Sequence, residues 1–398
     1  MPNVYDVTNW TIAANPSVTA YSDIGAIIND IIATIKTNQT NQSSKPGAMI
    51  YIPPGDYSLK TRVTIDISYL QIKGSGHGFT SIGIRNGAGN TSSWFELNPG
   101  ASHIRVENTD GQAEAFLVSR GGNPRLSSVE FRDFCLDGVS FSSPYVNGKV
   151  GIRVATANDS FRIEGMGFVF LEHALIDYNA DALNVTGNFM TECGSCVELT
   201  GSGQASKVTN NHMGAGYIGF SIFAEGHTGL LIAGNNIFPA GASMVHFKNT
   251  SQSCITENRF NSYYPGSINT EGSNNENLIS GNHFWRQSDP NTSHPSQPGW
   301  DELYGEMFLL GSNNMISGNH ISYDVDPSRV TPSTSTVPTM ILVKSGANNF
   351  ISNNHVEGSV AVNTVVLDVS TTGTKVLDSG SSSQVLSYSS SYTLRPTP

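Results

Sequence analysis

The chain has 398 residues, a formal net charge of −11 and 13% charged residues, against roughly 25% in an ordinary globular protein. Gly, Asn, Ser and Thr take the place of the missing charges, which favours a turn-rich β-structure and argues against a helical protein. The acidic balance without a Lys/Arg cluster argues against nucleic acid as a partner, and no apolar run approaches the ~20 residues of a membrane span.

The chain opens with one predicted helix. Residues 22–37, SDIGAIINDIIATIKT, place apolar side chains at helical spacing, and Ser22 or Asp23 can serve as the N-cap. We interpret this helix as a plug over the open end of the repetitive structure that follows. The first ten residues, MPNVYDVTNW, lack the charged-then-apolar pattern of a signal peptide, which indicates a cytoplasmic protein or a shortened N-terminus.

Short strands follow the helix. In residues 47–59, GAMIYIPPGDYSL, a buried strand is predicted to end at the sharp turn Pro53-Pro54-Gly55, after which a second strand begins. Residues 61–140 indicate further short strands of irregular spacing, and residues 141–149 a surface loop.

A repeat dominates the chain from residue 150 onwards. Each copy has an apolar or β-branched residue, in most copies a small residue, then a variable residue, Asn, another variable residue and an apolar residue. The central positions are Asn188, Asn211, Asn235, Asn258, Asn282, Asn319 and Asn354. Successive Asn residues lie 23 or 24 apart up to Asn282, and the last two gaps, 37 and 35, fit one repeat plus an insertion. Weaker copies centre on Phe134 and Met166.

This period predicts an all-β fold, a right-handed parallel β-helix. Each coil would hold three short strands and three turns, with coils about 4.8 Å apart. We expect Asn at one turn because it tolerates the left-handed backbone region and because stacked amides can hydrogen-bond to one another. A leucine-rich repeat would need a dense Leu pattern and helices. The predicted domains are an N-terminal segment with the capping helix (1–46), the β-helix (47–375) and a C-terminal tail (376–398).

Cysteine and histidine indicate structural roles. Cys193 and Cys196 form a lone C-x-x-C, which lacks the second pair or nearby His ligands of a zinc site. We interpret them as small buried thiols, like Cys135 and Cys254. His212, His283, His320 and His355 each follow a repeat Asn directly, which favours a structural stack over a metal site. We therefore expect neither a metal nor another cofactor.

Asp181 is the first of two carboxylates that the repeat does not explain. Residues at equal offsets from the repeat Asn should stack in neighbouring coils. Asp181 lies seven before Asn188, so it should stack between Asp159 and Gln204. Two carboxylates one coil apart repel each other, which favours the protonated form of one of them. The alternative is that Asp181 caps a turn.

Glu192 is the second such carboxylate. It lies four after Asn188, where the same offset places Phe170 below it and Ala215 above it. Apolar neighbours favour the protonated form, which suits a general acid. The alternative is an ordinary exposed residue. Asp181 and Glu192 are half a coil apart, so a site that joins them needs a bend between strands or a second subunit.

Five further residues are candidates for substrate binding: His173, Glu198, Gln204, Trp300 and Asp301. His173 lies in the coil before Asp181. Trp300 and Asp301 belong to the largest predicted insertion of the repeat region, residues 286–303. Binding residues often lie on long loops of a rigid scaffold, and an aromatic residue beside acids suits a sugar. The alternative is a solvated loop.

The chain resembles the inulin fructotransferases along nearly its whole length. The similarity is carried by SDIGAIINDIIA, IPPGDY, PGASHIRV, FRDFCLDGV, MGFVFLEHAL, ADALNV, ECGSCVELTG, NHMGAG, DELYG and STTGTKVLDSG. The resemblance implies a homotrimeric right-handed β-helix enzyme with its site near a subunit interface. It implies that Asp181 of ADALNV and Glu192 of TECGSC are the catalytic carboxylates, and we expect a secreted protein whose signal peptide is absent from this chain.

The implied reaction is cleavage of the terminal difructosyl unit of inulin, a β-2,1-linked fructan. A hydroxyl of the adjacent fructose replaces water as the acceptor, and the product is a cyclic difructose dianhydride. Segments 216–229 and 286–303 differ from the type III-forming pattern, so we favour the type I product. The resemblance leaves a dianhydride III hydrolase open. From other classes, a non-catalytic carbohydrate-binding β-helix and a pectin lyase remain alternatives, although residues 178–200 hold no Lys or Arg for a lyase.

Overall fold

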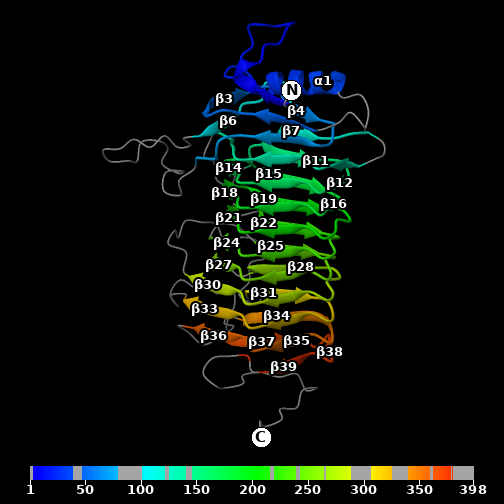
Figure 1. The fold of residues 1–398 in the computed structure, drawn as a ribbon. Coiled ribbons are helices and arrows are strands. Elements are labelled where there is room, and N and C mark those ends of the chain that lie inside the picture. The colour runs from blue at the N-terminus through cyan, green and yellow to red at the C-terminus, as the bar shows by residue number, and fades with distance from the viewer. Residues whose placement is uncertain are drawn as a thin grey trace, which may run out of the picture. The chain divides into compact units, whose positions relative to one another are not determined.

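The computed structural model describes residues 3–38, 47–78, 101–121, 125–139, 146–215, 219–238, 243–263, 266–287, 306–324, 339–358, 362–377 and 379. The chain divides into two compact units, Met1–Glu198 and Leu199–Pro398. Each unit consists of short parallel strands stacked coil after coil (Figure 1), which confirms the predicted parallel β-helix. In the described part of the chain, no helix is long and apolar enough to cross a membrane.

The first unit begins with β1 (Val4–Asp6), a 3-10 turn (Val7–Asn9) and helix α1 (Ile24–Asn38). The Asp23 carboxylate accepts a hydrogen bond from the Ala26 N–H at 3.3 Å, so Asp23 is the predicted N-cap. The buried face of α1 includes Ile27, Ile28 and Ile31, and it packs against β2, β3 and β4, early strands of three different sheets. This is the position expected of a helix that covers the core at one end, although the exact domain boundaries stay a prediction.

Three long sheets and one short sheet organise the first unit. Sheet A contains β1, β2 (Ala48–Tyr51), β5 (Leu70–Lys73), β9 (Glu130–Arg132), β13 (Arg162–Glu164) and β17 (Asn184–Thr186). Sheet B contains β3 (Gly55–Leu59), β6 (Ser102–Val106), β10 (Cys135–Asp137), β14 (Gly167–Val169) and β18 (Phe189–Cys193). Sheet C contains β4 (Val63–Ile65), β7 (Glu114–Val118), β11 (Val150–Val154), β15 (His173–Tyr178) and β19 (Ser195–Thr200), and the short sheet D contains β8 (Leu126–Ser127), β12 (Asn158–Asp159) and β16 (Ala180–Asp181).

The second unit repeats sheets A, B and C. Sheet A contains β20 (Lys207–Thr209), β23 (Leu231–Ala233), β26 (Cys254–Thr256), β29 (Leu278–Ser280), β32 (Met315–Ser317), β35 (Phe350–Ser352) and β39 (Lys375–Leu377). Sheet B contains β21 (His212–Ala215), β24 (Asn236–Ile237), β27 (Arg259–Ser262), β30 (His283–Gln287), β33 (His320–Asp324) and β36 (His355–Gly358). Sheet C contains β22 (Phe220–Glu225), β25 (Ser243–Lys248), β28 (Ile268–Glu271), β31 (Met307–Leu310), β34 (Thr339–Ala347) and β37 (Asn363–Leu367), and β38 (Thr371–Thr372) pairs with β34.

The repeat Asn residues form the predicted ladder between sheets A and B. In the second unit the Nδ2 of Asn282 donates to Oδ1 of Asn319 at 3.0 Å, and Oδ1 of Asn282 accepts from Nδ2 of Asn258 at 3.0 Å. All three side chains are buried. A buried amide keeps its place only when its donors and acceptors are satisfied, so the ladder fixes the register of successive coils.

We expected the repeat Asn itself to adopt the left-handed backbone region, and this prediction was wrong. The left-handed residue is the one before each ladder Asn: Gly187 (φ 65°), Asn210 (φ 56°) and Gly281 (φ 65°) are examples. The ladder Asn itself is selected for its side-chain hydrogen bonds. Glycine is favoured at the preceding position because it adopts positive φ without strain.

In the coils of the Asn ladder, chain length varies where sheet B leads into sheet C. There the link from sheet A to sheet B is a pair of residues, such as 187–188 or 281–282, whereas in the earlier coils β5 and β6 are joined by residues 74–101. From sheet B to sheet C the link ranges from residue 194 alone to residues 288–306, and residues 325–338 form another long link. The insertion predicted at 286–303 therefore starts too early, because Arg286 and Gln287 belong to β30.

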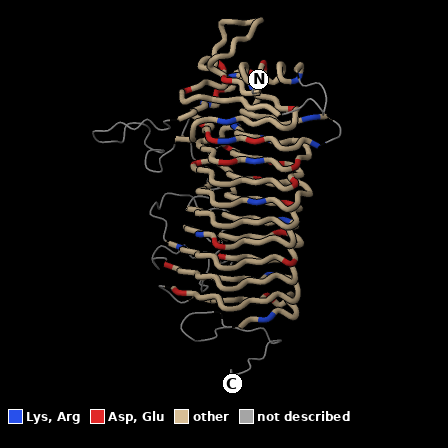
Figure 2. The backbone as a smooth tube through the Cα atoms, in the orientation of Figure 1, with Lys and Arg blue, Asp and Glu red and all other residues tan. Residues whose placement is uncertain are grey.

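Side chains on the three sheets alternate between the interior and the surface. In sheet A, for example, Phe131, Ile163 and Val185 are paired in successive strands and fully buried. Figure 2 shows acidic and basic residues interspersed along the coils of each unit. The core is thus an apolar column, and the polar side chains that could contact a ligand lie on the outer faces and at the corners.

Candidate active site

Asp181 lies at a corner between sheets C and A of the first unit. It pairs with Asp159 in the β12–β16 ladder, which confirms the predicted neighbour. The Nη1 of Arg125 contacts Oδ2 of Asp181 at 2.9 Å, and the two side chains are 43% and 26% exposed. The guanidinium offsets the charge of the two neighbouring carboxylates and orients Asp181. The sequence did not indicate Arg125, because it comes from an irregular coil 56 residues earlier.

The backbone of this corner presents Asp181 outward. Asn179 (φ 54°) and Ala182 (φ 52°) on either side adopt the left-handed region, whereas Ala180 between them is fully buried. A non-glycine residue in this region is uncommon and carries a conformational cost, and such residues gather at functional sites. The corner is therefore held by the coils around it.

Glu192 lies at the opposite corner, where sheet B leads into sheet C. It is half-buried near the end of β18 and has φ 53°. The Phe170 N–H donates to the Glu192 carbonyl oxygen at 3.0 Å, which confirms the predicted neighbour, and Phe170 has φ 55° as well. Two left-handed residues of bulky type thus stack in adjacent coils at this corner.

The two carboxylates of one chain lie at opposite ends of a sheet C strand. Phe170, the neighbour of Glu192, precedes β15, and Asp181 follows it. The six residues of β15 span about 20 Å at roughly 3.3 Å per residue. Asp181 and Glu192 of one copy cannot act on the same bond, because the paired carboxyl groups of glycosidases lie about 5 to 9.5 Å apart.

His173 and Glu198 form the second polar group of the first unit. The Nδ1 of His173 is hydrogen-bonded to Oε2 of Glu198, and the side chains are 31% and 16% exposed. This hydrogen bond raises the pKa of His173 above its ordinary value, while burial opposes the shift. His173 is the first residue of β15, so the pair lies on the outward face of sheet C towards the Glu192 corner.

The roles of the other predicted binding residues stay predictions. Gln204 belongs to the second unit, where it forms an isolated parallel bridge with Thr228. Trp300 and Asp301 lie outside the described residues.

The cysteines are mostly buried. Cys135, Cys193 and Cys196 are buried, Cys254 is half-buried, and none of these four described residues forms a disulfide. Burial raises the pKa of Cys193 to about 12, so its reactive thiolate form is suppressed. This agrees with the prediction of structural thiols. Among the described residues, no three His, Cys, Asp or Glu side chains converge as metal ligands.

The predicted histidine stack lies on sheet B of the second unit. The rings of His283 and His320 are 5.1 Å apart between centroids, and those of His320 and His355 are 4.9 Å apart. His320 and His355 also share a hydrogen bond of 2.9 Å between their Nδ1 atoms. His212 stands one coil from Asn236 instead, so it is not part of this stack.

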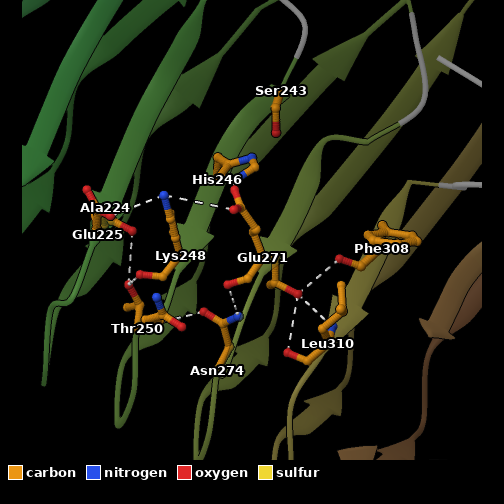
Figure 3. Close-up of polar contacts among 12 residues, drawn as sticks. Ala224, Glu225, Ser243, His246, Lys248, Thr250, Glu271, Asn274, Phe308 and Leu310 are labelled. Atoms are coloured by element: carbon orange, nitrogen blue, oxygen red, sulfur yellow. Dashed lines mark hydrogen bonds and ion pairs between the residues drawn. The ribbon is translucent and has the colours of Figure 1, made fainter. Parts of the chain in front are cut away.

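Sheet C of the second unit carries a line of aligned outward side chains. Their order is Phe223, His246, Asn269, Phe308, Leu342 and Val366. Beside them, the Nζ of Lys248 lies 3.2 Å from Oε1 of Glu225 and 3.9 Å from Oε1 of Glu271 (Figure 3). Four of the six aligned residues are apolar and half-buried, which is unusual for a surface that only faces solvent.

The stacked coils define a parallel β-helix protein with half-buried carboxylates at its corners. The family model for the β-helix repeat of inulin fructotransferase matches residues 281–398. A DFA-I-forming inulin fructotransferase of Arthrobacter globiformis is 51% identical over 401 residues, which cover 99% of each chain. The chain belongs to the inulin fructotransferase family.

Solved structures support the same relationship. DFA-IIIase of Arthrobacter chlorophenolicus A6 in complex with DFA-III is 44% identical and superposes with a TM-score of 0.90, over 100% of this chain and 99% of that one. The same enzyme without its lid, in complex with GF2, is 45% identical with a TM-score of 0.89, over 99% and 100% of the two chains. ORF18 of Geobacillus virus E2, 14% identical with a TM-score of 0.52, shares the fold alone.

Proposed function

We propose that the protein is an inulin fructotransferase that releases the type I difructose dianhydride from the fructose end of inulin. The observation that carries this proposal is the 51% identity, along 99% of both chains, to a DFA-I-forming relative. A dianhydride III hydrolase is the second candidate, because the solved neighbours are DFA-IIIase at 43–45% identity.

The proposed catalytic groups are Asp181 and Glu192. Glu192 donates a proton to the leaving oxygen as the fructosidic bond breaks, and positive charge develops on the fructosyl ring. Asp181, oriented by Arg125, stabilises that charge and accepts the proton of the attacking hydroxyl. The net reaction moves one proton from the acceptor hydroxyl to the leaving oxygen, so water is not consumed. The assignment with the two roles exchanged predicts the same products.

We propose that each site forms between two copies of a homotrimer. The separation of about 20 Å within one chain supports a site in which Asp181 meets Glu192 of another copy. The apolar line on sheet C of the second unit, which includes Phe223, Phe308, Leu342 and Val366, supports contact between copies through this sheet. A closed ring of head-to-tail contacts then brings the Asp181 edge of each copy to the Glu192 edge of the next.

Substrate contacts would come from the same faces. His173 and Glu198 lie on the sheet C surface towards Glu192 and present hydrogen-bonding groups to a sugar. We propose these two residues, with Gln204, Trp300 and Asp301, as substrate ligands. We also propose that the protein is secreted, because its polymeric substrate is best reached outside the cell.

Product analysis tests the activity. Purified protein is incubated with inulin, and the products are separated against type I dianhydride, type III dianhydride and fructose. We expect type I dianhydride from the wild type and a loss of about 10²–10⁴-fold in Glu192→Gln and in Asp181→Asn. Asp324→Asn, which removes an exposed carboxylate of β33, is the matched control and should retain activity.

Other products would redirect the proposal. Type III dianhydride from inulin would correct the product class. Opening of added type III dianhydride, without any reaction on inulin, would establish the hydrolase instead. Inertness towards both substrates would favour a carbohydrate-binding protein.

Mixing the two inactive variants tests the shared site. In trimers assembled at random from Asp181→Asn and Glu192→Gln chains, about a quarter of the interfaces combine both wild-type carboxylates. We expect about a quarter of wild-type activity after co-expression, and activity about 10²–10⁴-fold below wild type from either variant alone. If the mixture is as inactive as its parents, the two residues do not meet between copies.

A further inference from the structure

Asp177 is a buried acid that the proposed chemistry does not use. It lies in β15 with no exposed surface. In the two preceding coils the same position of sheet C is held by Val154 and Val118, both buried. An acid in a column of valines is costly unless it is neutral or specifically bound. Its presence four residues before Asp181 therefore needs a reason.

The contacts of Asn158 connect Asp177 to the Asp181 corner. The buried Nδ2 of Asn158 donates to Oδ1 of Asp177 at 2.6 Å and to the Tyr178 carbonyl at 3.3 Å. Asp159 and Ser160, which follow Asn158, contact Asp181 at the other end of the corner. Asp159 pairs with Asp181, and the Ser160 N–H donates to the Asp181 carbonyl at 2.9 Å. One segment thus holds the corner at its entrance and at its exit.

We propose that Asp177 is a positioning residue: its neutral carboxyl group, bound by Asn158, fixes the corner that presents Asp181. The proposal rests on the proposed function of Asp181. Burial raises the pKa of Asp177 to about 8, and the Asn158 hydrogen bond opposes this shift. The carboxyl group is therefore neutral at pH 6 and ionises at mildly alkaline pH inside an apolar column. A buried charge there draws in water or a new donor and loosens the corner.

Several other ionisable groups lie on β15 and on the strands around it. On β15 itself, His173 is half-buried and Tyr178 is exposed. On the neighbouring strands, the charged groups are half-buried at outward positions and the buried groups are thiols: Arg153 of β11, Asp159 of β12, Asp181 of β16, Glu192 and Cys193 of β18, and Cys196 and Glu198 of β19. Burial is what raises the pKa of Asp177, and the Asn158 hydrogen bond lowers it in part.

The pH profile of kcat tests the proposal. Asp177→Asn keeps the shape of the side chain and cannot ionise. We expect equal kcat for wild type and variant at pH 6. At pH 9 the wild type should be lower by about tenfold, because the neutral fraction falls about tenfold per pH unit above the pKa. KM should be unchanged, and Asp324→Asn should follow the wild-type profile.

A melting series separates positioning from simple stability. The folded-state pKa of Asp177 lies above its unfolded value, so the stability it contributes is present at low pH and is lost as the pH rises through about 8. The melting temperature of the wild type should fall from pH 6 to pH 9 by more than that of Asp177→Asn. Identical kcat profiles, measured well below melting, would overturn the positioning role even if the melting curves differ.

Asn158→Ala provides an independent check. It removes the hydrogen bond that favours the ionised form of Asp177, so the alkaline decline should move to higher pH while kcat at pH 6 falls. An unchanged kcat at pH 6 would contradict the role of this bond. A wild type without activity on inulin or dianhydride, with normal melting, would instead refute the function of Asp181 and this inference with it.

Discussion

Arg286 and Arg125 each hold a carboxylate at 2.9 Å, but in opposite surroundings. The Arg286–Glu306 pair in the second unit is 3% and 1% exposed, and Ser262 and Ser267 also donate to Glu306. The Arg125–Asp181 pair in the first unit is 43% and 26% exposed. The first pair closes the two ends of the link between β30 and β31. The second leaves its carboxylate partly exposed, so the same kind of ion pair lies inside the scaffold in one place and at its surface in the other.

The largest effect should come from breaking the buried pair. Arg286→Met removes the guanidinium that balances the charge of the buried Glu306 carboxylate, so we expect the free energy of unfolding to fall by about 3–5 kcal/mol. Arg125→Met should change it by only about 0–1 kcal/mol while lowering kcat. Urea unfolding measures both. The double variant Arg286→Met/Glu306→Leu should recover much of the loss, and failure to recover would show that the charge is not the cause.

The ladder should give an intermediate effect. Asn282→Ala removes hydrogen bonds to Ile255, Asn258 and Asn319 in a buried environment, for an expected loss of about 2–4 kcal/mol. Asn188→Ala in the first unit should cost about 1 kcal/mol less, because the preceding coil has Met166, which offers only its N–H to Asn188. Equal losses in urea unfolding would mean that side-chain pairing adds nothing to the ladder.

The smallest effect should be a gain in stability. Glu192 has φ 53°, a conformation that glycine adopts without strain. Glu192→Gly should therefore raise the free energy of unfolding by about 1 kcal/mol and abolish dianhydride formation. Glu192→Gln, which keeps the side-chain volume and the strain, should leave stability unchanged. If glycine destabilises the protein, the corner is not strained at Glu192.

The regular coils were predictable from the sequence, and the corners were less so. The spacing of the Asn residues predicted the register of the coils, because a shift of one coil against the next would break the ladder of buried amides. The same spacing correctly predicted Asp159 beside Asp181 and Phe170 beside Glu192. The spacing of the Asn residues could not predict Arg125, because Arg125 reaches Asp181 from a coil of irregular length. It also missed the left-handed backbone of Ala182 and Glu192, since neither residue type favours it. Asp177 could have been noticed as an acid at a valine position, once the coils were aligned.

In the coils of the Asn ladder, the links from sheet B to sheet C differ in length while the links from sheet A to sheet B stay at two residues, and this makes that part of the fold open to modification. New segments added there need not disturb the stacked amides, because the two edges are separate parts of each coil. Diversification of this scaffold, in evolution or in the laboratory, is therefore expected to proceed by loop exchange along a single edge. That edge also carries Glu192, the proposed acid, so segments that change specificity can be added beside it.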